Sequence, residues 1–259
     1  MKITVLMENS ALPGFACEHG LSLLIETGDT RILFDAGQSG AFAENGEKLG
    51  VDLGQVDFAV LSHGHYDHGG GMRTFLERNH TAPLYLREDA FDAHYNGSSK
   101  YIGLDEKLRD TDRLRFVSGK LPLGAGMALH SGAELPTPFG IRPFGLTVRR
   151  NGAFLPETFG HEQYLIIEEN GKRICFSGCS HRGVLNILRH FRPQVLVGGF
   201  HFSKLDPAGE DLLRAAEVLL EGETVYYTGH CTGQAQFDAL KAVLGDRLRS
   251  IHAGMVFEI

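Results

Sequence analysis

The chain begins with short apolar runs separated by turn residues, a pattern typical of β-strands. The runs are rich in β-branched and large aliphatic side chains, and Gly28 and Asp29 mark a tight turn between two of them. We expect strands over residues 3–7, 21–26, 31–34, 58–61 and 83–86. Apolar side chains at helical spacing predict helices over residues 41–49 and from residue 72 onward. The first half of the chain is therefore predicted to be rich in strands.

Strand and helix alternate regularly in the second half. Asn170-Gly171 joins two apolar runs and is a strong signal for a β-hairpin. We expect strands over residues 164–167, 173–176, 194–197 and 224–227, and helices over residues 184–190, 208–220 and 234–244. An α/β fold with two sheets packed face to face and helices outside accommodates both halves. The prediction is an αββα sandwich formed by a single domain, residues 1–259.

The pattern loosens between residues 88 and 159, where Gly and Pro are scattered and no chemical motif occurs. Two stretches, residues 114–117 and 141–148, are hairpin-like. Long connections of this kind commonly carry function. We interpret residues 88–159 as an insertion that shapes or covers a pocket, or as a small subdomain.

Composition excludes several classes of protein. The 259 residues include 25 Lys and Arg against 32 Asp and Glu, a formal net charge of −7, whereas nucleic-acid and membrane surfaces need clustered positive charge. The apolar start reaches Glu8 too soon for a secretory signal, and no run is long enough for a transmembrane helix. Four cysteines are too few for a disulfide scaffold in a chain of this length. We expect a cytoplasmic protein that acts on a small molecule, and no pattern indicates its oligomeric state.

Thirteen histidines are the unusual feature of the composition, and several of them directly follow apolar runs. His63-Gly64-His65-Tyr66-Asp67-His68 places four metal-binding side chains within six residues, after a predicted strand and before two glycines. On a strand, His63 and His65 project to one face, while Asp67 and His68 can turn back to a second point nearby. Two metal ions about 3.5–4 Å apart can be held in this way.

The spacing His-x-His-x-Asp-His resembles the signature of the metallo-β-lactamase superfamily, and further matches follow in the expected order. Asp35, after an early strand, resembles the aspartate that orients the metal-binding loop from behind. Cys179, in Ser177-Gly178-Cys179, stands where most members have a bridging aspartate. His230, in Tyr227-Thr228-Gly229-His230, resembles the final histidine. The resemblance implies the αββα fold and a dinuclear metal centre.

One subgroup of that superfamily is more closely similar, the synthases of 7,8-dihydropterin-6-methyl-4-(β-D-ribofuranosyl)aminobenzene 5′-phosphate. The matching stretches are Glu18-His19-Gly20-Leu21-Ser22, residues 61–68, Glu162-Gln163, Ser177-Gly178-Cys179-Ser180-His181, Gly198-Gly199-Phe200-His201 and Gly229-His230-Cys231-Thr232-Gly233. This chain has His161 where the subgroup commonly has an acidic residue before Glu-Gln, and the region between Leu86 and Phe159 matches no pattern. The resemblance therefore describes the metal centre better than the pocket.

The resemblance implies a ligand set for each of two divalent ions, zinc first, with iron or manganese as alternatives. The first set is His63, His65 and either His181 or His161, of which we favour His181. The second set is Asp67, His68 and His230. Cys179 could give this second ion a thiolate or bridge both ions, and its alternative is a small buried residue at a strand end. Cys175 lies within an apolar strand and is expected in the core.

The implied reaction is that of a hydrolase or transferase. A metal-bound hydroxide would attack, or the metals would activate a leaving group, on a small molecule of the phosphorylated or pterin-like kind. Asp67 would orient the attacking group, and His201 would either polarise a carbonyl or phosphoryl oxygen of the substrate or donate a proton to the leaving group. His201 and His19 each have a structural loop position as the alternative, and His94 lies outside every motif and is expected to be non-catalytic. A dinuclear-iron oxidoreductase of the same fold is the alternative function.

Overall fold

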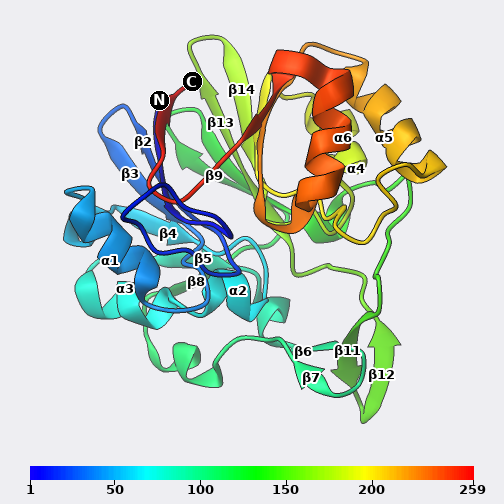
Figure 1. The fold of residues 1–259 in the computed structure, drawn as a ribbon. Helices are drawn as coiled ribbons and strands as arrows, with labels where there is room; N and C mark the ends of the chain where they lie inside the picture. Colours follow the sequence, from blue (N-terminus) through cyan, green and yellow to red (C-terminus); the bar gives the residue numbers. More distant parts are fainter.

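Two seven-stranded sheets form the centre of the molecule, which a computed structural model describes over residues 1–259 (Figure 1). In spatial order the first sheet contains β18 (Val256–Glu258), β1 (Lys2–Met7), β2 (Ser22–Thr27), β3 (Thr30–Phe34), β4 (Phe58–Val60), β5 (Leu84–Leu86) and β8 (Leu114–Phe116). The second contains β17 (Leu248–Ser250), β16 (Val225–Thr228), β15 (Val195–Val197), β14 (Lys172–Phe176), β13 (Gln163–Glu169), β10 (Met127–Ser131) and β9 (Lys120–Gly124). Each half of the chain therefore supplies most of one sheet.

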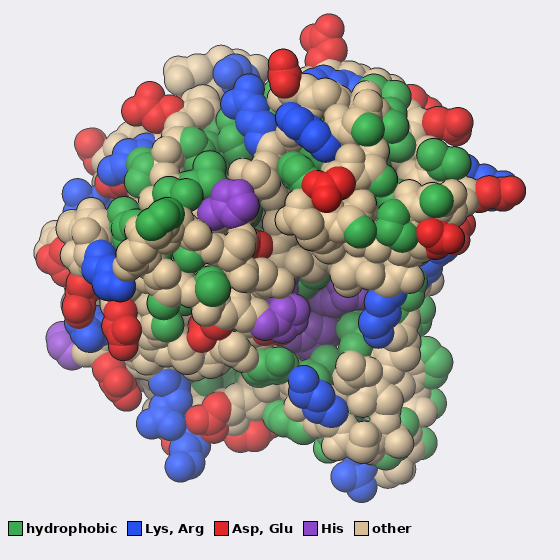
Figure 2. Space-filling model, in the orientation of Figure 1, with side chains coloured by type: hydrophobic (Ala, Val, Ile, Leu, Met, Phe, Trp, Pro, Cys, Tyr) green, Lys and Arg blue, Asp and Glu red, His purple; other side chains and the backbone are tan.

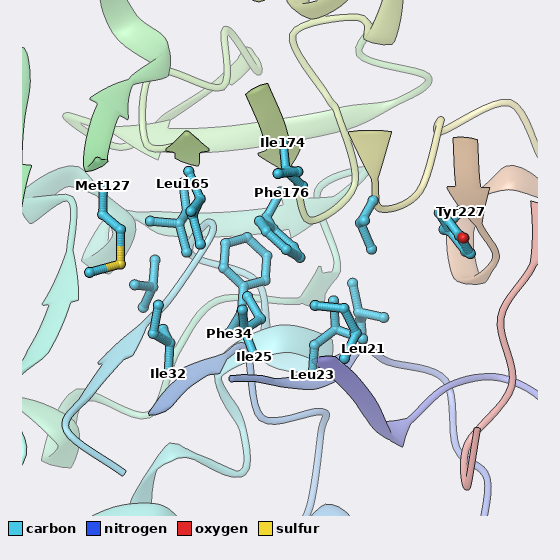
Figure 3. Close-up of a cluster of buried hydrophobic side chains, with 14 of the residues drawn as sticks. Leu21, Leu23, Ile25, Ile32, Phe34, Met127, Leu165, Ile174, Phe176 and Tyr227 are labelled. Carbon is cyan, nitrogen blue, oxygen red and sulfur yellow. The ribbon is translucent and has the colours of Figure 1, made fainter. Parts of the chain in front are cut away.

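Apolar side chains between the sheets form the central core (Figure 3). Phe34 and Leu23 from the first sheet face Phe176 and Leu165 from the second, and the rings of Phe34 and Phe176 lie 6.0 Å apart between centroids. Full burial of such a side chain contributes about 1.5–3 kcal/mol. Strand residues that alternate between the two faces of a sheet therefore hold the sandwich together.

Helices cover the outer face of each sheet. Helices α1 (Ala41–Lys48) and α3 (Met72–Arg78) lie on the first sheet, and α4 (Val184–Phe191), α5 (Glu210–Leu220) and α6 (Gln234–Leu244) lie on the second. The one-turn helix α2 (Tyr66–Gly69) lies within the histidine-rich loop. Short 3-10 helices are η1 (Leu53–Gln55), η2 (Glu88–Phe91), η3 (Glu106–Asp110), η4 (Gly132–Glu134), η5 (His230–Thr232) and η6 (Gly245–Arg247). The predicted αββα sandwich is confirmed, and no helix is long and apolar enough to cross a bilayer.

The segment 88–159 is divided among three sheets. Its strands β6 (Ala93–Asn96), β7 (Lys100–Tyr101), β11 (Leu146–Arg150) and β12 (Ala153–Pro156) form a separate four-stranded sheet that projects from the sandwich in Figure 1. Residues 114–117, predicted as hairpin-like, instead include β8, which pairs in parallel with β5. The hairpin predicted over residues 141–148 is displaced along the chain, because β11 pairs with β12. An apolar run this short does not reveal its pairing partner.

Candidate metal centre

The candidate metal-binding residues meet at one edge of the two sheets. Strand β4 is followed by the loop of residues 62–68, and the neighbouring parallel strands β14, β15 and β16 are followed by Cys179, His201 and His230. Because the carboxyl ends of parallel strands share one edge of a sheet, these loops converge. They line a cavity of about 600 Å³. Figure 2 shows it as a hollow with histidine side chains at its floor and basic side chains at its rim.

We define the second metal position as the space between Asp67, His68 and His230. Nε2 of His68 lies 3.2 Å from Nε2 of His230, and Oδ2 of Asp67 lies 3.3 Å from Nε2 of His230. Sγ of Cys179 is 3.2 Å from Nε2 of His68. In a tetrahedral zinc site with bonds of about 2.0–2.1 Å, neighbouring nitrogen ligands are roughly 3.3 Å apart. Nε2 of His230 thus has the spacing of zinc ligands to both other atoms, while Nε2 of His68 lies 4.0 Å from Oδ2 of Asp67.

Hydrogen bonds on the far side of each ring determine which nitrogen can bind a metal. Nδ1 of His68 donates to Oδ2 of Asp35 at 2.6 Å, and Nδ1 of His230 donates to Oδ1 of Asn9 at 2.8 Å. The N–H of Gly20 donates to the same Oδ1, which fixes the orientation of the Asn9 amide. In the neutral rings both Nε2 atoms therefore carry lone pairs, and they face each other. Converging lone pairs need a cation between them, so these residues fit a divalent metal ion.

We define the first metal position as the space between His63, His65 and His181. Nε2 of His63 lies 3.3 Å from Nε2 of His181, again the spacing of zinc ligands. Nδ1 of His63 donates to the hydroxyl of Ser62 at 2.8 Å, and that hydroxyl donates to Asp35. Nε2 of His63 therefore carries its lone pair. The ring of His65 lines the cavity, with its centroid 4.6 Å from that of His63 and 4.8 Å from that of His181.

Cys179 lies between the two metal positions. Its Sγ is within 4.8 Å of ligand atoms of His63 and His181 on one side, and of His68 and His230 on the other. Burial raises the pKa of the Cys179 thiol well above its ordinary value. A bound cation opposes this effect, because metal coordination deprotonates a thiol. The position of the sulfur is compatible with a thiolate that serves the second ion or bridges both.

Burial also controls the protonation of the other ligands. It lowers the pKa of His63, His65 and His181 well below the usual value, and neighbouring imidazoles add to the effect. Neutral imidazole is the form that binds metals. Burial opposes ionisation of Asp67, yet the imidazoles of His19 and His230 hold the pKa of this carboxyl well below its ordinary value. At neutral pH the first position therefore offers neutral nitrogens and the second an anionic oxygen, whereas the carboxylate of Asp35 raises the pKa of His68.

Asp35 braces the histidine-rich loop from behind. Its carboxylate accepts hydrogen bonds from the backbone N–H of Ser62 at 2.7 Å, from the Ser62 hydroxyl at 2.6 Å and from the ring of His68. Both side chains that it binds are completely buried, so the carboxylate has no competing water. The predicted support of the histidine-rich loop by Asp35 is confirmed.

Glu162 and Gln163 connect the two halves of the centre. Glu162 accepts hydrogen bonds from the backbone N–H groups of His181 at 2.7 Å and Arg182 at 3.0 Å, although burial raises the pKa of its carboxyl. The Gln163 amide donates to the carbonyl of Leu61, at the end of the strand that carries the histidine-rich loop. The matched Glu-Gln pair therefore holds the loops in place and binds no metal itself.

Glu8 and Asn9, which no motif included, support the final histidine. Glu8 accepts a hydrogen bond from the backbone N–H of His230, and Asn9 binds the ring of the same residue. Both residues directly follow strand β1. Polar side chains immediately after a buried strand were the available signal, because loops at strand ends commonly build sites.

The two candidates for the third histidine of the first position differ in tautomer. The N–H of Gly64 donates to Nδ1 of His161 at 2.9 Å, so the proton of the neutral ring is on Nε2, which then has no lone pair for a metal. Nε2 of His181 faces the first position, and the geometry therefore favours His181. His161 lies instead against His65 and His94, with centroid distances of 5.3 and 4.0 Å.

His201 and His19 both line the cavity. The ring of His201 lies 4.2 Å from that of His181 between centroids, and its backbone has a left-handed φ of 55°. Nε2 of His19 lies 3.3 Å from Oδ2 of Asp67 at the mouth of the second position. Both histidines can therefore contact a molecule bound beside the metal positions.

The other three cysteines have different surroundings. Cys175 is completely buried in β14, as predicted for a core residue, whereas Cys17 is exposed. The Cys231 thiol is buried beside the centre and donates to the carbonyl of Cys179 at 3.4 Å. Neither Cys17 nor Cys175 can contribute to the metal positions.

Known proteins share this sequence pattern. The family model of the Metallo-beta-lactamase superfamily matches residues 16–230 of this chain. An uncharacterized protein of Methanocaldococcus jannaschii is 27% identical over 238 residues, which cover 89% of this chain and 90% of the relative. The 7,8-dihydropterin-6-methyl-4-(beta-D-ribofuranosyl)-aminobenzene-5′-phosphate synthase of the same organism is 26% identical over 272 residues, covering 94% of this chain and 91% of the synthase.

A solved structure shows the same architecture over the whole chain. The crystal structure of Tm1679, a metal-dependent hydrolase of the beta-lactamase superfamily, superposes with a TM-score of 0.87 at 32% sequence identity. The match covers 100% of this chain and 99% of that one. Sequence, fold and the arrangement of candidate ligands thus agree, and the chain belongs to the metallo-beta-lactamase superfamily.

Proposed function

We propose that the protein is a hydrolase or transferase that uses two divalent metal ions to act on a small phosphorylated molecule. The observation that carries the proposal is the position of Nε2 of His230, which lies at the spacing of zinc ligands from both Nε2 of His68 and Oδ2 of Asp67. The names of two similar proteins support an activity of this class. Tm1679 is described as a metal-dependent hydrolase, and one of the two M. jannaschii relatives is named as an aminobenzene-5′-phosphate synthase.

The metal positions and the cavity wall would divide the chemistry between them. Ions held at both positions would lower the pKa of a nearby water and polarise a phosphoryl or carbonyl oxygen. Asp67 is held ionised, so its carboxylate can accept a hydrogen bond from the attacking group and orient it. His201, on the cavity wall beside His181, is the proposed proton donor to the leaving group. Hydrolysis and transfer differ only in whether water or another nucleophile attacks.

Lys100 and Lys204 give the cavity a positive wall in a chain of net charge −7. Nζ of Lys204 donates to the carbonyl of Phe144 at 2.6 Å, and Nζ of Lys100 lies 5.5 Å from the centre of the Tyr66 ring. Neither lysine has an acidic partner in the structure. Helix α6 begins at Gln234 on the same cavity with no side-chain cap, so its first N–H groups are free for an anion. These features, and the phosphate in the name of the related synthase, support a phosphorylated substrate.

Metal analysis of protein purified without added metal tests the proposal. We expect two equivalents of zinc per chain, together with hydrolysis of bis(p-nitrophenyl) phosphate that a chelator abolishes and zinc restores. Protein that retains no metal and binds none on titration would overturn the proposal. Two equivalents of iron with electron-transfer activity and no hydrolysis would support the oxidoreductase alternative in its place.

A further inference from the structure

Cys231 belongs to a matched motif but to neither of the two ligand sets. It directly follows His230, and its side chain lines the cavity of the metal centre together with that of Cys179. Cys231 is 7% exposed and Cys179 is 3% exposed, and both are free thiols. A small molecule that enters the cavity can therefore reach both sulfur atoms.

The two sulfur atoms lie close together beside His201. Sγ of Cys179, Sγ of Cys231 and a ring nitrogen of His201 are within 4.8 Å of one another. A disulfide bond is about 2.05 Å long, so the sulfurs need to approach by at most about 2.8 Å. A change of side-chain rotamer moves a sulfur atom by roughly this distance. The pair is therefore placed for a disulfide that the structure does not contain.

The loops that carry the two cysteines are joined by hydrogen bonds. The N–H of Gly199 donates to the carbonyl of Gly178 at 2.8 Å, and the N–H of Ser203 donates to the carbonyl of Cys231 at 3.2 Å. A Cβ atom at residue 199 would overlap Sγ of Cys231, so the glycine makes the room that this sulfur occupies. The loops that follow β14, β15 and β16 thus hold the sulfurs near each other on one platform.

The other two cysteines have no such arrangement. Cys175 is completely buried in β14, and Cys17 is exposed. Neither side chain lines the cavity. A peroxide in the cavity therefore meets one pair of thiols, and Cys175 and Cys17 serve as internal controls for oxidation in the core and at the surface.

We propose that hydrogen peroxide in the cavity joins Cys179 and Cys231 in a disulfide and thereby withdraws the Cys179 sulfur from the metal ions. The Cys231 sulfur attacks one peroxide oxygen, the O–O bond breaks, and the departing hydroxide leaves as water with the thiol proton. The Cys179 sulfur then attacks the sulfenic acid sulfur, and the S–S bond forms. The hydroxyl group leaves as a second water, with a proton from the Cys179 thiol or, when a metal binds the thiolate, from solvent. Two thiols are oxidised and one peroxide is reduced.

The consequence for the metal centre follows from the chemistry of sulfur ligands. A thiolate is the form of cysteine that binds a metal ion, and a disulfide sulfur carries no negative charge. The ion or ions that Cys179 serves therefore bind more weakly after oxidation, and a dithiol reductant restores them. This consequence rests on the proposed function, whereas formation of the disulfide requires no metal.

Mild oxidation of the full-length zinc protein tests the proposal. With one equivalent of hydrogen peroxide per chain, we expect a peptide map to show Cys179 linked to Cys231, while a chromogenic chelator detects release of at least one of two zinc ions. Dithiothreitol and added zinc should reverse both changes. A free Cys175 thiol in the same map checks that the protein stayed folded, because this side chain is buried in the core.

Two substitutions separate the pair from general oxidation. Cys231→Ser, whose hydroxyl can still donate to the carbonyl of Cys179, should form no link and keep its zinc at the same dose. Cys17→Ser is the matched control and should behave like the native protein.

Three outcomes would contradict the account, and they are distinguishable. Native protein without the link, or equal zinc loss in Cys231→Ser, would overturn this inference and leave the proposed function intact. A link that forms without loss of zinc would overturn it as well, because Cys179 would then serve no metal ion. Native protein that binds no zinc would overturn the proposed function itself, and the peptide map would still test the disulfide.

Discussion

The two metal positions use the same kinds of ligand but are supported by different parts of the chain. At the second position the histidine rings are held by Asp35 and Asn9, which directly follow strands of the first sheet. At the first position the ring of His65 lies 5.6 Å, between centroids, from that of His94, which belongs to the small projecting sheet. The second position is therefore built by the sandwich alone, whereas the first includes a segment with no recognisable motif.

This difference indicates how one fold can keep a metal centre and change its chemistry. The supports of the second position come from the ends of β1 and β3, two neighbours of β2 in the first sheet. The supports of the first can change with the segment that also lines the cavity, because Lys100 and His94 lie on neighbouring strands. Substrate recognition and the properties of one metal ion are then linked through the small sheet.

The largest effect should come from removing the first position altogether. We expect His63→Ala combined with His65→Ala to retain one equivalent of metal in place of two and to lower phosphodiester hydrolysis by about 10³-fold, since the stabilisation that one ion supplies is worth several kcal/mol. Elemental analysis and steady-state kinetics measure both effects, with circular dichroism as the check on folding. Unchanged metal content in the double variant would show that these histidines are not ligands.

A smaller effect, largest at the second position, should follow from Asp35→Asn. Oδ1 of the carboxylate accepts from the Ser62 backbone, and Oδ2 accepts from the Ser62 hydroxyl and His68, so an amide NH2 group in place of either oxygen would face a donor. We expect zinc affinity at the second position to fall about 10- to 100-fold, with less change at the first. The matched control is Asp52→Asn at the surface turn before η1. Equal weakening of both ions would contradict the separate supports described above.

The lysines on the cavity wall should affect substrate binding more than metal binding. We expect Lys100→Ala and Lys204→Ala each to raise KM for a phosphate ester about three- to tenfold with little change in kcat, because a partly exposed charge pair contributes about 1 kcal/mol. Lys172→Ala, at the exposed start of β14, is the control. The same KM in the native protein and in all three variants would contradict an anionic substrate.

The smallest effect concerns the sandwich away from the metal centre. Burial lowers the pKa of His130, in β10, from 6.5 to about 4, and the charge of Lys120 adds to this. As the pH falls, His130 takes up a proton near pH 6.5 in the unfolded chain but only near pH 4 in the folded protein. Its contribution to stability is therefore fully present above pH 6.5 and is lost as the pH falls to about 4. His130 is half-buried, so after screening by solvent the loss is about 1 kcal/mol.

Urea unfolding of the metal-free protein at several pH values checks this contribution. In His130→Gln the free energy of unfolding should depend less steeply on pH between about 4 and 6.5. If the pH dependence of the free energy of unfolding is unchanged in His130→Gln, the loss of stability in acid comes instead from the histidines of the two metal positions. The variant thereby separates the acid response of the sandwich from that of the metal centre.

The sandwich could be predicted from the sequence because its signals are local. Apolar periodicity and the Asn170-Gly171 turn located β1 to β5, β13 to β16 and the five covering helices, but not β9, β10, β17 or β18. The loop from His63 to His68 carries its spacing within six residues. The parallel pairing of β8 could not be predicted, because a three-residue strand contains no information about its neighbour. Its placement depends on the sheet edge that β5 leaves open.

The supports of the metal ligands were hidden for a similar reason. Asn9 binds a ring 221 residues later in the chain, and His94 binds Glu157 across 63 residues. No periodicity connects such pairs, and a histidine in a loosely patterned segment is more often structural. His161 was ambiguous because its tautomer depends on one backbone N–H, that of Gly64, which only the folded chain brings to it.

The most direct test of two metal positions with different supports is a crystal structure of the protein with an anomalous difference map at the zinc absorption edge. The account predicts two peaks about 3.5–4 Å apart, one against His65 and Nε2 of His63 and the other against Nε2 of His68 and His230. A single peak, or a peak enclosed by His65, His94 and His161, would contradict it.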